Sequence, residues 1–174
     1  MRVSNSLVVF AVAASLAAGA ATLRAEIIDR ILAVVDGAII MQSDLAVAVR
    51  LGLVPSGGAD ATSAALDRLI ERQLMLSEVD RYAPPEPAAA EIDRRVADIR
   101  ARAGTEFERV LLLGGIGLEQ LRREVRDDLR IDAYLQQRFG AAEPSGDETR
   151  QRAGTINEWL TGLRRRANIS VLPR

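Results

Sequence analysis

Apolar residues recur with helical spacing along most of the chain, and this pattern predicts a mainly helical protein. The exception is "ILAVVDGAIIM", Ile31 to Met41, which is two short apolar runs around Asp36-Gly37, a dipeptide that favours a tight turn between antiparallel strands. The sequence therefore predicts one β-hairpin followed by helices. These helices are expected over Ser43 to Gly52, Ala64 to Tyr82, Pro87 to Arg102, "EFERVLLLGG", Leu118 to Phe139 and Thr149 to Ala167.

A second strand-like stretch, "ISVL" from Ile169 to Leu172, closes the sequence. An isolated two-stranded hairpin is marginal in water, so we expect this stretch to pair beside the hairpin and join the two ends of the chain. The predicted fold is mainly α: an irregular multi-helix domain with a small antiparallel sheet made of the N-terminal hairpin and the C-terminal strand.

Turn and cap residues set the expected boundaries between these elements. Ser43 is expected to cap the first helix, and Thr62 or Ser63 the second, after a loop from Val54 to Ser63. The segment from Gly140 to Glu148 is rich in Gly, Pro and Ser and is expected to be a linker.

The helices carry more apolar faces than one thin helical layer needs. The helix ending at Tyr82 has two apolar stripes on nearly opposite sides, so it is either sandwiched between neighbours or exposes one stripe. Ordinary core packing is one interpretation. The other is a groove that takes unfolded polypeptide on an adaptable apolar surface. The candidate client-binding residues are Met41, Leu45, Met75, Val79, Tyr82, Leu112, Leu113 and Ile116.

Composition excludes much of enzymology. The 174 residues contain no Cys and no His, which removes disulfides, thiol nucleophiles and imidazole acid–base chemistry, and we expect no catalytic residue, cofactor or metal. The net charge of −1 gives no sign of a nucleic-acid-binding surface. The carboxylates Asp127, Asp128 and Asp132 lie among Arg residues, and we expect them to form solvated i,i+4 ion pairs.

The first residues are typical of a secretory signal. Arg2 precedes an apolar block from Leu7 to Ala21, and small residues follow, up to Ala25. We expect residues 1–25 to be removed as a signal peptide and residues 26–174 to form one domain. The alternative is an uncleaved membrane anchor, because no charge falls between Arg2 and Arg24.

The order of elements resembles that of the SurA-type periplasmic chaperones. The stretch "EIIDRILAVVDGAIIMQSDL" resembles the hairpin and helix that follow the signal in that family, and "ALDRLIERQLMLSEVDRY" resembles its next helix. The segment from "AEIDRRVADIRARAG" to Phe139 is similar to the family's helix pair, glycine break and long helix, and "WLTGLRRRANISVL" to its C-terminus. The resemblance covers nearly all of residues 26–174.

The resemblance implies an α-helical, ATP-independent holdase that receives outer-membrane and secreted proteins in the periplasm. Many members carry parvulin prolyl-isomerase domains where this chain has only Gly140 to Glu148, and parvulin sites rely on histidines that are absent here. A prolyl isomerase is therefore not expected. The alternative is an interaction subunit of a cell-envelope complex without general chaperone activity.

Overall fold

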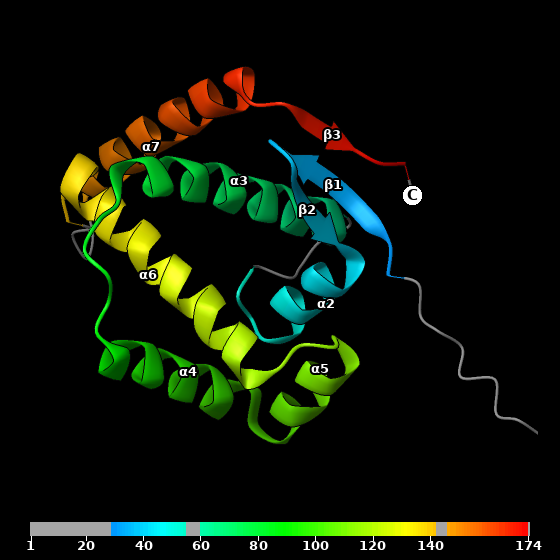
Figure 1. The fold of residues 1–174 in the computed structure, drawn as a ribbon. Helices are drawn as coiled ribbons and strands as arrows, with labels where there is room; N and C mark the ends of the chain where they lie inside the picture. The colour runs from blue at the N-terminus through cyan, green and yellow to red at the C-terminus, as the bar shows by residue number, and fades with distance from the viewer. Residues whose placement is uncertain (1–28, 55–59, 142–145, 174) are drawn as a thin grey trace, which may run out of the picture.

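The computed structural model describes residues 29–54, 60–141 and 146–173, which are mainly helical with a small antiparallel sheet. The predicted fold class is confirmed (Figure 1). The predicted signal peptide, residues 1–25, and the middle of the predicted linker, residues 142–145, lie outside the described residues.

The sheet joins the two ends of the described chain. Strands β1 (Ile31–Val35) and β2 (Ala38–Met41) form the predicted hairpin, and β3 (Ile169–Val171) pairs antiparallel with β1, so the strand order is β2-β1-β3. Asp36 and Gly37 both have positive φ, at 49° and 91°, as a tight hairpin turn of the primed type requires. The predicted third strand is confirmed.

Backbone and side-chain hydrogen bonds fix β3 in place. The Asp36 amide donates to the carbonyl of Asn168 at 2.9 Å, and the Asn168 amide donates back to the Asp36 carboxylate at 2.8 Å. The Leu172 amide donates to the carbonyl of Leu32 at 2.9 Å. Both ends of β3 are therefore bonded to the hairpin.

Six helices fill the rest of the described chain. Their bounds are α2 (Gln42–Arg50), α3 (Ala61–Tyr82), α4 (Ala89–Ala103), α5 (Phe107–Leu113, preceded by a 3₁₀ turn Gly104–Glu106), α6 (Leu118–Phe139) and α7 (Asp147–Arg166). Figure 1 shows α7 and the sheet along α3, while α6 runs diagonally from α3 toward α4 and α5.

The predicted cap residues were wrong at two helix starts. Helix α2 begins at Gln42, one residue before Ser43, and Ser43 does not cap it: its backbone N–H, at 3.1 Å, and its hydroxyl both donate to the carboxylate of Asp29. The carboxylate of Asp44 accepts the Met41 amide at 2.8 Å. Helix α3 begins at Ala61 after Asp60, before both Thr62 and Ser63. At the other helix ends, the observed boundary lies within two residues of the predicted one. Helix α6 has the predicted bounds.

Helix α3 is packed between neighbours on both sides, which is one of the two arrangements predicted from its two apolar stripes. Leu66, Ile70 and Leu74 pack into a cluster with the inner face of the sheet and with α7. On the other side, Val79 packs against Ile131 and Tyr134 of α6. Helices α2, α4, α5 and the first half of α6 build a separate cluster around Phe107.

Gly114 marks the closest approach within this second cluster. A Cβ atom added there would lie 2.2 Å from the Cγ2 of Val47, far inside contact distance, whereas one added at Gly154 on the exposed side of α7 would meet nothing within 4 Å. The α5–α2 packing therefore requires glycine at position 114.

We expect Gly114→Ala to lower the free energy of unfolding by about 1–3 kcal/mol, because the extra methyl group overpacks the contact with Val47. Gly154→Ala is the matched control and should raise stability by about 0.5–1 kcal/mol, since alanine favours an exposed helix interior. Urea denaturation of both variants measures the difference. Equal effects of the two substitutions would contradict the close packing at Gly114.

Candidate functional site

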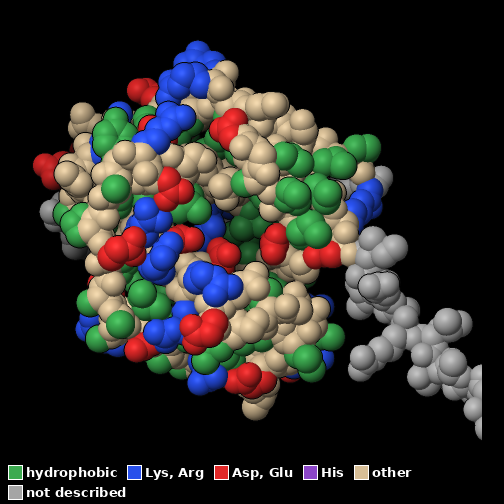
Figure 2. Space-filling model, in the orientation of Figure 1, with side chains coloured by type: hydrophobic (Ala, Val, Ile, Leu, Met, Phe, Trp, Pro, Cys, Tyr) green, Lys and Arg blue, Asp and Glu red, His purple; other side chains and the backbone are tan. Residues whose placement is uncertain are grey.

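A groove of about 590 Å³ opens between β2, α2, α3, α4 and α6, and we call it the central groove. Its apolar lining comes from Ile39, Ile40, Val47, Ala48, Leu53, Val54, Leu69, Met75, Ile116, Leu121, Ile131 and Leu135. Figure 2 shows a hollow in the middle of this face, with hydrophobic side chains in it and charged side chains of both signs around it. The groove thus combines an apolar interior with a charged margin.

The exposed groove residues include some that sequence reasoning missed. Ile39 on β2 is 55% exposed although it is a large apolar side chain, and Leu53 after α2 is also exposed. In the alternating pattern of a strand, Ile39 points away from the face that buries Ile40. Strand β2 lies at the edge of the sheet, and both isoleucines contribute to the groove lining, Ile39 as an exposed side chain and Ile40 as a buried one.

Only two of the eight predicted client-binding residues lie in the central groove. Met75 and Ile116 line it, and both are partly buried. Leu112 and Leu113 are 80% and 58% exposed at the end of α5, outside the groove lining. The structure therefore divides the predicted surface into at least two parts.

The other predicted residues lie elsewhere. Val79 has no exposed surface and belongs to the core, so the prediction that it contacts a client directly is wrong for this conformation. Tyr82 is 61% exposed and lies against Tyr134, with ring centroids 5.3 Å apart. Met41 is partly buried where β2 meets α2, and Leu45 lines a different hollow, described below.

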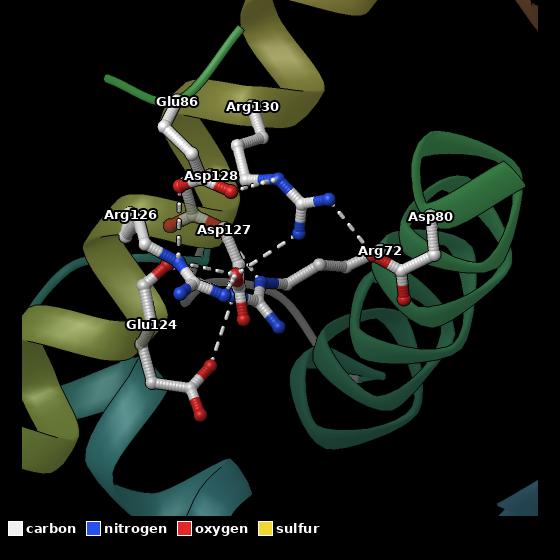
Figure 3. Close-up of polar contacts among 8 residues, drawn as sticks. All are labelled: Arg72, Asp80, Glu86, Glu124, Arg126, Asp127, Asp128 and Arg130. Carbon is white, nitrogen blue, oxygen red and sulfur yellow. Dashed lines mark hydrogen bonds and ion pairs between the residues drawn. The ribbon is translucent and has the colours of Figure 1, made fainter. Parts of the chain in front are cut away.

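Ion pairs between α3 and α6 form one wall of the groove. Arg72 of α3 pairs with Asp128 at 2.6 Å and with Glu124 at 2.9 Å, and it donates a further bond to the Glu124 carbonyl at 3.0 Å. Figure 3 shows the Arg72 side chain reaching from α3 to these α6 carboxylates. The guanidinium is thus held across the two helices.

A second arginine joins the same helices outside the groove. Arg130 is the buried charged residue among those the structure describes, and it pairs with Asp80 of α3 at 3.0 Å, with Asp127 at 3.5 Å and with Glu86 at 3.6 Å (Figure 3). Its Nε lacks a hydrogen bond of normal length but faces the Glu86 carboxylate. Truncating either partner of such a pair would leave a charge with reduced compensation.

The prediction of i,i+4 ion pairs for Asp127, Asp128 and Asp132 is wrong: Asp127 pairs with Arg126 and Arg130, and Asp132 has no ion-pair partner among the described residues. Asp128 pairs with Arg72, 56 residues away in the sequence, rather than with a residue of its own helix. A signal for this existed, because Glu124, Asp128 and Asp132 follow one another at four-residue intervals and place like charges on one face of α6. Like charges at this spacing destabilise an isolated helix, so they indicate a cation on another element.

Burial, together with the like charges on this acidic face, raises the pKa of two carboxyl groups. Burial raises the pKa of Glu124 above its ordinary 4.5, Arg72 opposes this, and neighbouring carboxylates add to it. Burial also raises the pKa of Asp132, helped by Asp128 and opposed by Arg95 and Arg152. Asp132 and Arg95 both line the groove and are not within ion-pairing distance of any described residue.

The described residues contain no group of three or more acidic residues placed to hold a metal ion. In the same part of the chain, no helix is both long enough and apolar enough to cross a membrane. What the groove can do is bind apolar surface, with charged groups at its margin.

Comparisons with known proteins return no match, either among models of protein families or among curated proteins.

We expect Glu124→Gln to gain stability relative to the wild type as the pH rises from 4 to 7. The raised pKa means that folded Glu124 keeps its proton to a higher pH than unfolded Glu124, so its ionisation reduces the stability of the wild type over this range. Glutamine cannot ionise and avoids this loss. Urea denaturation at both pH values measures the difference in unfolding free energy.

Glu119→Gln is the control for this comparison, because Glu119 lies five residues earlier on α6 and is mostly exposed, 3.8 Å from Arg122. The difference in unfolding free energy between Glu119→Gln and the wild type should change much less between pH 4 and 7. If the wild type instead gained stability relative to Glu124→Gln as the pH rose, pairing with Arg72 would outweigh burial, contrary to the prediction.

Proposed function

We propose that this protein is a periplasmic, ATP-independent chaperone that holds unfolded outer-membrane or secreted proteins by their apolar segments. The observation that carries the proposal is the central groove, about 590 Å³ in volume and open between the helices and the edge of the sheet. Its size falls in the range of sites that hold a substantial ligand.

The character of the groove lining suits varied clients. Met75 supplies a flexible side chain, and branched apolar side chains such as Ile39 and Ile116 supply contact area without a specific hydrogen-bonding pattern. Met75 lies on α3 and Ile116 in the loop between α5 and α6, and both line the groove. A lining of this kind discriminates little between apolar sequences, as a holdase requires.

The sequence supports the same proposal independently. The resemblance to the SurA-type chaperones extends over nearly all of residues 26–174, and the apolar N-terminal stretch is typical of a secretory signal. Isomerase activity forms no part of the proposal, because the sequence has no histidine and only a short segment, Gly140 to Glu148, where relatives insert parvulin domains.

One observation favours a second candidate function, an interaction subunit of a cell-envelope complex. Leu112 and Leu113 are exposed beside each other at the end of α5, and Leu118 at the start of α6 is exposed as well. A small apolar tip outside the groove suits one fixed partner better than varied clients. The two functions therefore use different residues and can be separated by substitution.

We expect the protein, in several-fold excess, to suppress light scattering by an outer-membrane protein diluted from denaturant. The variant Ile39→Lys/Leu53→Lys should need several times more protein for the same suppression, because it adds charge to the groove at two exposed positions. The matched control, Leu112→Lys/Leu113→Lys, adds the same charge at the tip of α5 and should behave like the wild type. Melting temperatures check that both variants fold.

Three results would go against this proposal. No suppression by the wild type over a concentration series would remove the holdase function. Loss of suppression only in the Leu112→Lys/Leu113→Lys variant would move the binding surface from the groove to the tip of α5. A pull-down that returns one stoichiometric envelope protein, lost in the same tip variant, would favour the interaction subunit.

A further inference from the structure

A second hollow of about 490 Å³ lies where α2, the first turn of α3 and the outer ends of β1 and β3 meet, and we call it the sheet-end pocket. Its apolar lining comes from Leu32, Leu45, Ala46, Val49, Ala61, Leu66, Val171 and Leu172. None of these residues lines the central groove. The sheet-end pocket is therefore a separate surface.

Part of the apolar lining of this pocket is open to solvent, whereas Leu45 and Leu66 at its base are buried. Val171 is 58% exposed and Leu172 is 40% exposed, although both are large apolar side chains at the end of β3. Val171 pairs with Ala33, whose side chain is fully buried, so the two residues lie on the same face of the sheet. The helices cover this face at Ala33 and leave it uncovered at Val171.

The charges around the sheet-end pocket are of one sign. Arg30 and Arg50 line it, whereas no described Asp or Glu does. The guanidinium of Arg30 donates to the carbonyl of Pro173, and neither arginine has an ion-pair partner among the residues the structure describes. Asp29, next to Arg30 in sequence, is already bonded to the hydroxyl and amide of Ser43.

This one-sided charge distinguishes the pocket from the central groove. There, Arg72 is neutralised by two carboxylates and Arg68 pairs with Glu71 at 3.0 Å. Two exposed arginines without such partners beside an apolar hollow complement a ligand that is apolar and acidic at once. Charge complementarity thus selects an acidic partner for the sheet-end pocket.

The two arginines lie near opposite ends of α2. The carbonyl of Arg30 accepts the amide of Gln42, the first residue of α2, at 2.8 Å, and Arg50 is the last residue of that helix. Eight helical steps separate the two ends of α2, a span of roughly 12 Å. In an extended chain, four residue steps span roughly 13 Å, and side chains four positions apart point to the same side. Two side chains at this spacing in an extended partner are therefore about as far apart as the two ends of α2.

The strand beside the pocket favours an extended partner. Strand β3 lies at the edge of the described sheet and pairs with β1 alone. An edge strand presents unpaired N–H and C=O groups on its free side, which an extended peptide can bind by adding a strand.

We propose that the sheet-end pocket binds an extended segment of another polypeptide in which two acidic residues, four positions apart, flank an apolar residue. The acidic side chains pair with Arg30 and Arg50, and the apolar side chain between them enters the hollow lined by Leu45, Val49 and Leu66. This inference does not rest on the proposed holdase function, because the pocket shares no residue with the central groove.

Fluorescence anisotropy with a labelled, end-capped Glu-Val-Leu-Val-Glu peptide tests the inference on the purified protein. The Glu peptide should bind more tightly than Gln-Val-Leu-Val-Gln or Lys-Val-Leu-Val-Lys, and added salt should weaken it. The variant Arg30→Gln/Arg50→Gln should lose roughly tenfold in affinity for the Glu peptide, and Arg30→Lys/Arg50→Lys should recover part of it.

The control Arg94→Gln/Arg102→Gln removes the same charge from two exposed positions of α4 and should bind the Glu peptide like the wild type. The central-groove variant Ile39→Lys/Leu53→Lys should also bind normally, so that a failed holdase assay and a failed peptide assay are distinguishable. Melting temperatures confirm that each variant folds.

Three outcomes would overturn the inference. Equal affinity for the Glu and Gln peptides would remove the role of charge. An equal loss in the α4 control would assign the effect to net charge rather than to the pocket. Binding of the Glu peptide only after removal of residues 1–28 would make the chain's own N-terminal segment, and not another polypeptide, the occupant.

Discussion

The pairing of β1 with β3 is the constraint on which the rest of the structure depends. It joins residues 132 positions apart, since the amide of Asn168 is bonded to the carboxylate of Asp36. A two-stranded hairpin is marginal in water, and the third strand turns it into a sheet with a face that can be buried. Ala33 and Val35 of β1 have no exposed surface because α3 and α7 pack on that face.

Helix α3 connects the sheet to the rest of the molecule. One side of α3 belongs to the sheet cluster through Ile70 and Leu74, and its other side meets α6 through Val79. The ion pairs of Arg72 with Asp128 and of Arg130 with Asp80 also link α3 to α6. Helices α3 and α6 are thus connected by side chains, and the central groove lies beside the contacts that Arg72 makes.

Much of the fold could be predicted from the sequence because its signals are local. The Asp36-Gly37 turn between two apolar runs specifies a hairpin, and the glycines around α6 mark where that helix begins and ends. The third strand followed from the weakness of an isolated hairpin. The helix caps were harder, since Asp29 bonds to Ser43 from 14 residues away and no local pattern records this contact.

The candidate site was less predictable, because it depends on contacts between distant segments. The helical periodicity of the sequence places Val79 on an apolar stripe, but it does not indicate which element covers that stripe; in the structure, α6 does. The sequence predicts that the acidic residues of α6 are solvated, whereas in the structure Arg72 of α3 pairs with two of them. The sequence predicts Ile39 as part of a hairpin, whereas the position of β2 at the edge of the sheet makes it a groove residue.

Native-state hydrogen exchange tests the central claim, that the sheet joining the chain ends holds the structure together. The amides of Asp36 and Leu172 donate to Asn168 and Leu32 across the β1–β3 junction. They should exchange only through global unfolding, with the same free energy as the amide of Leu74 in the buried part of α3. Rapid exchange of these two amides while Leu74 stays protected would contradict the claim, because the strand would then open without unfolding the helices.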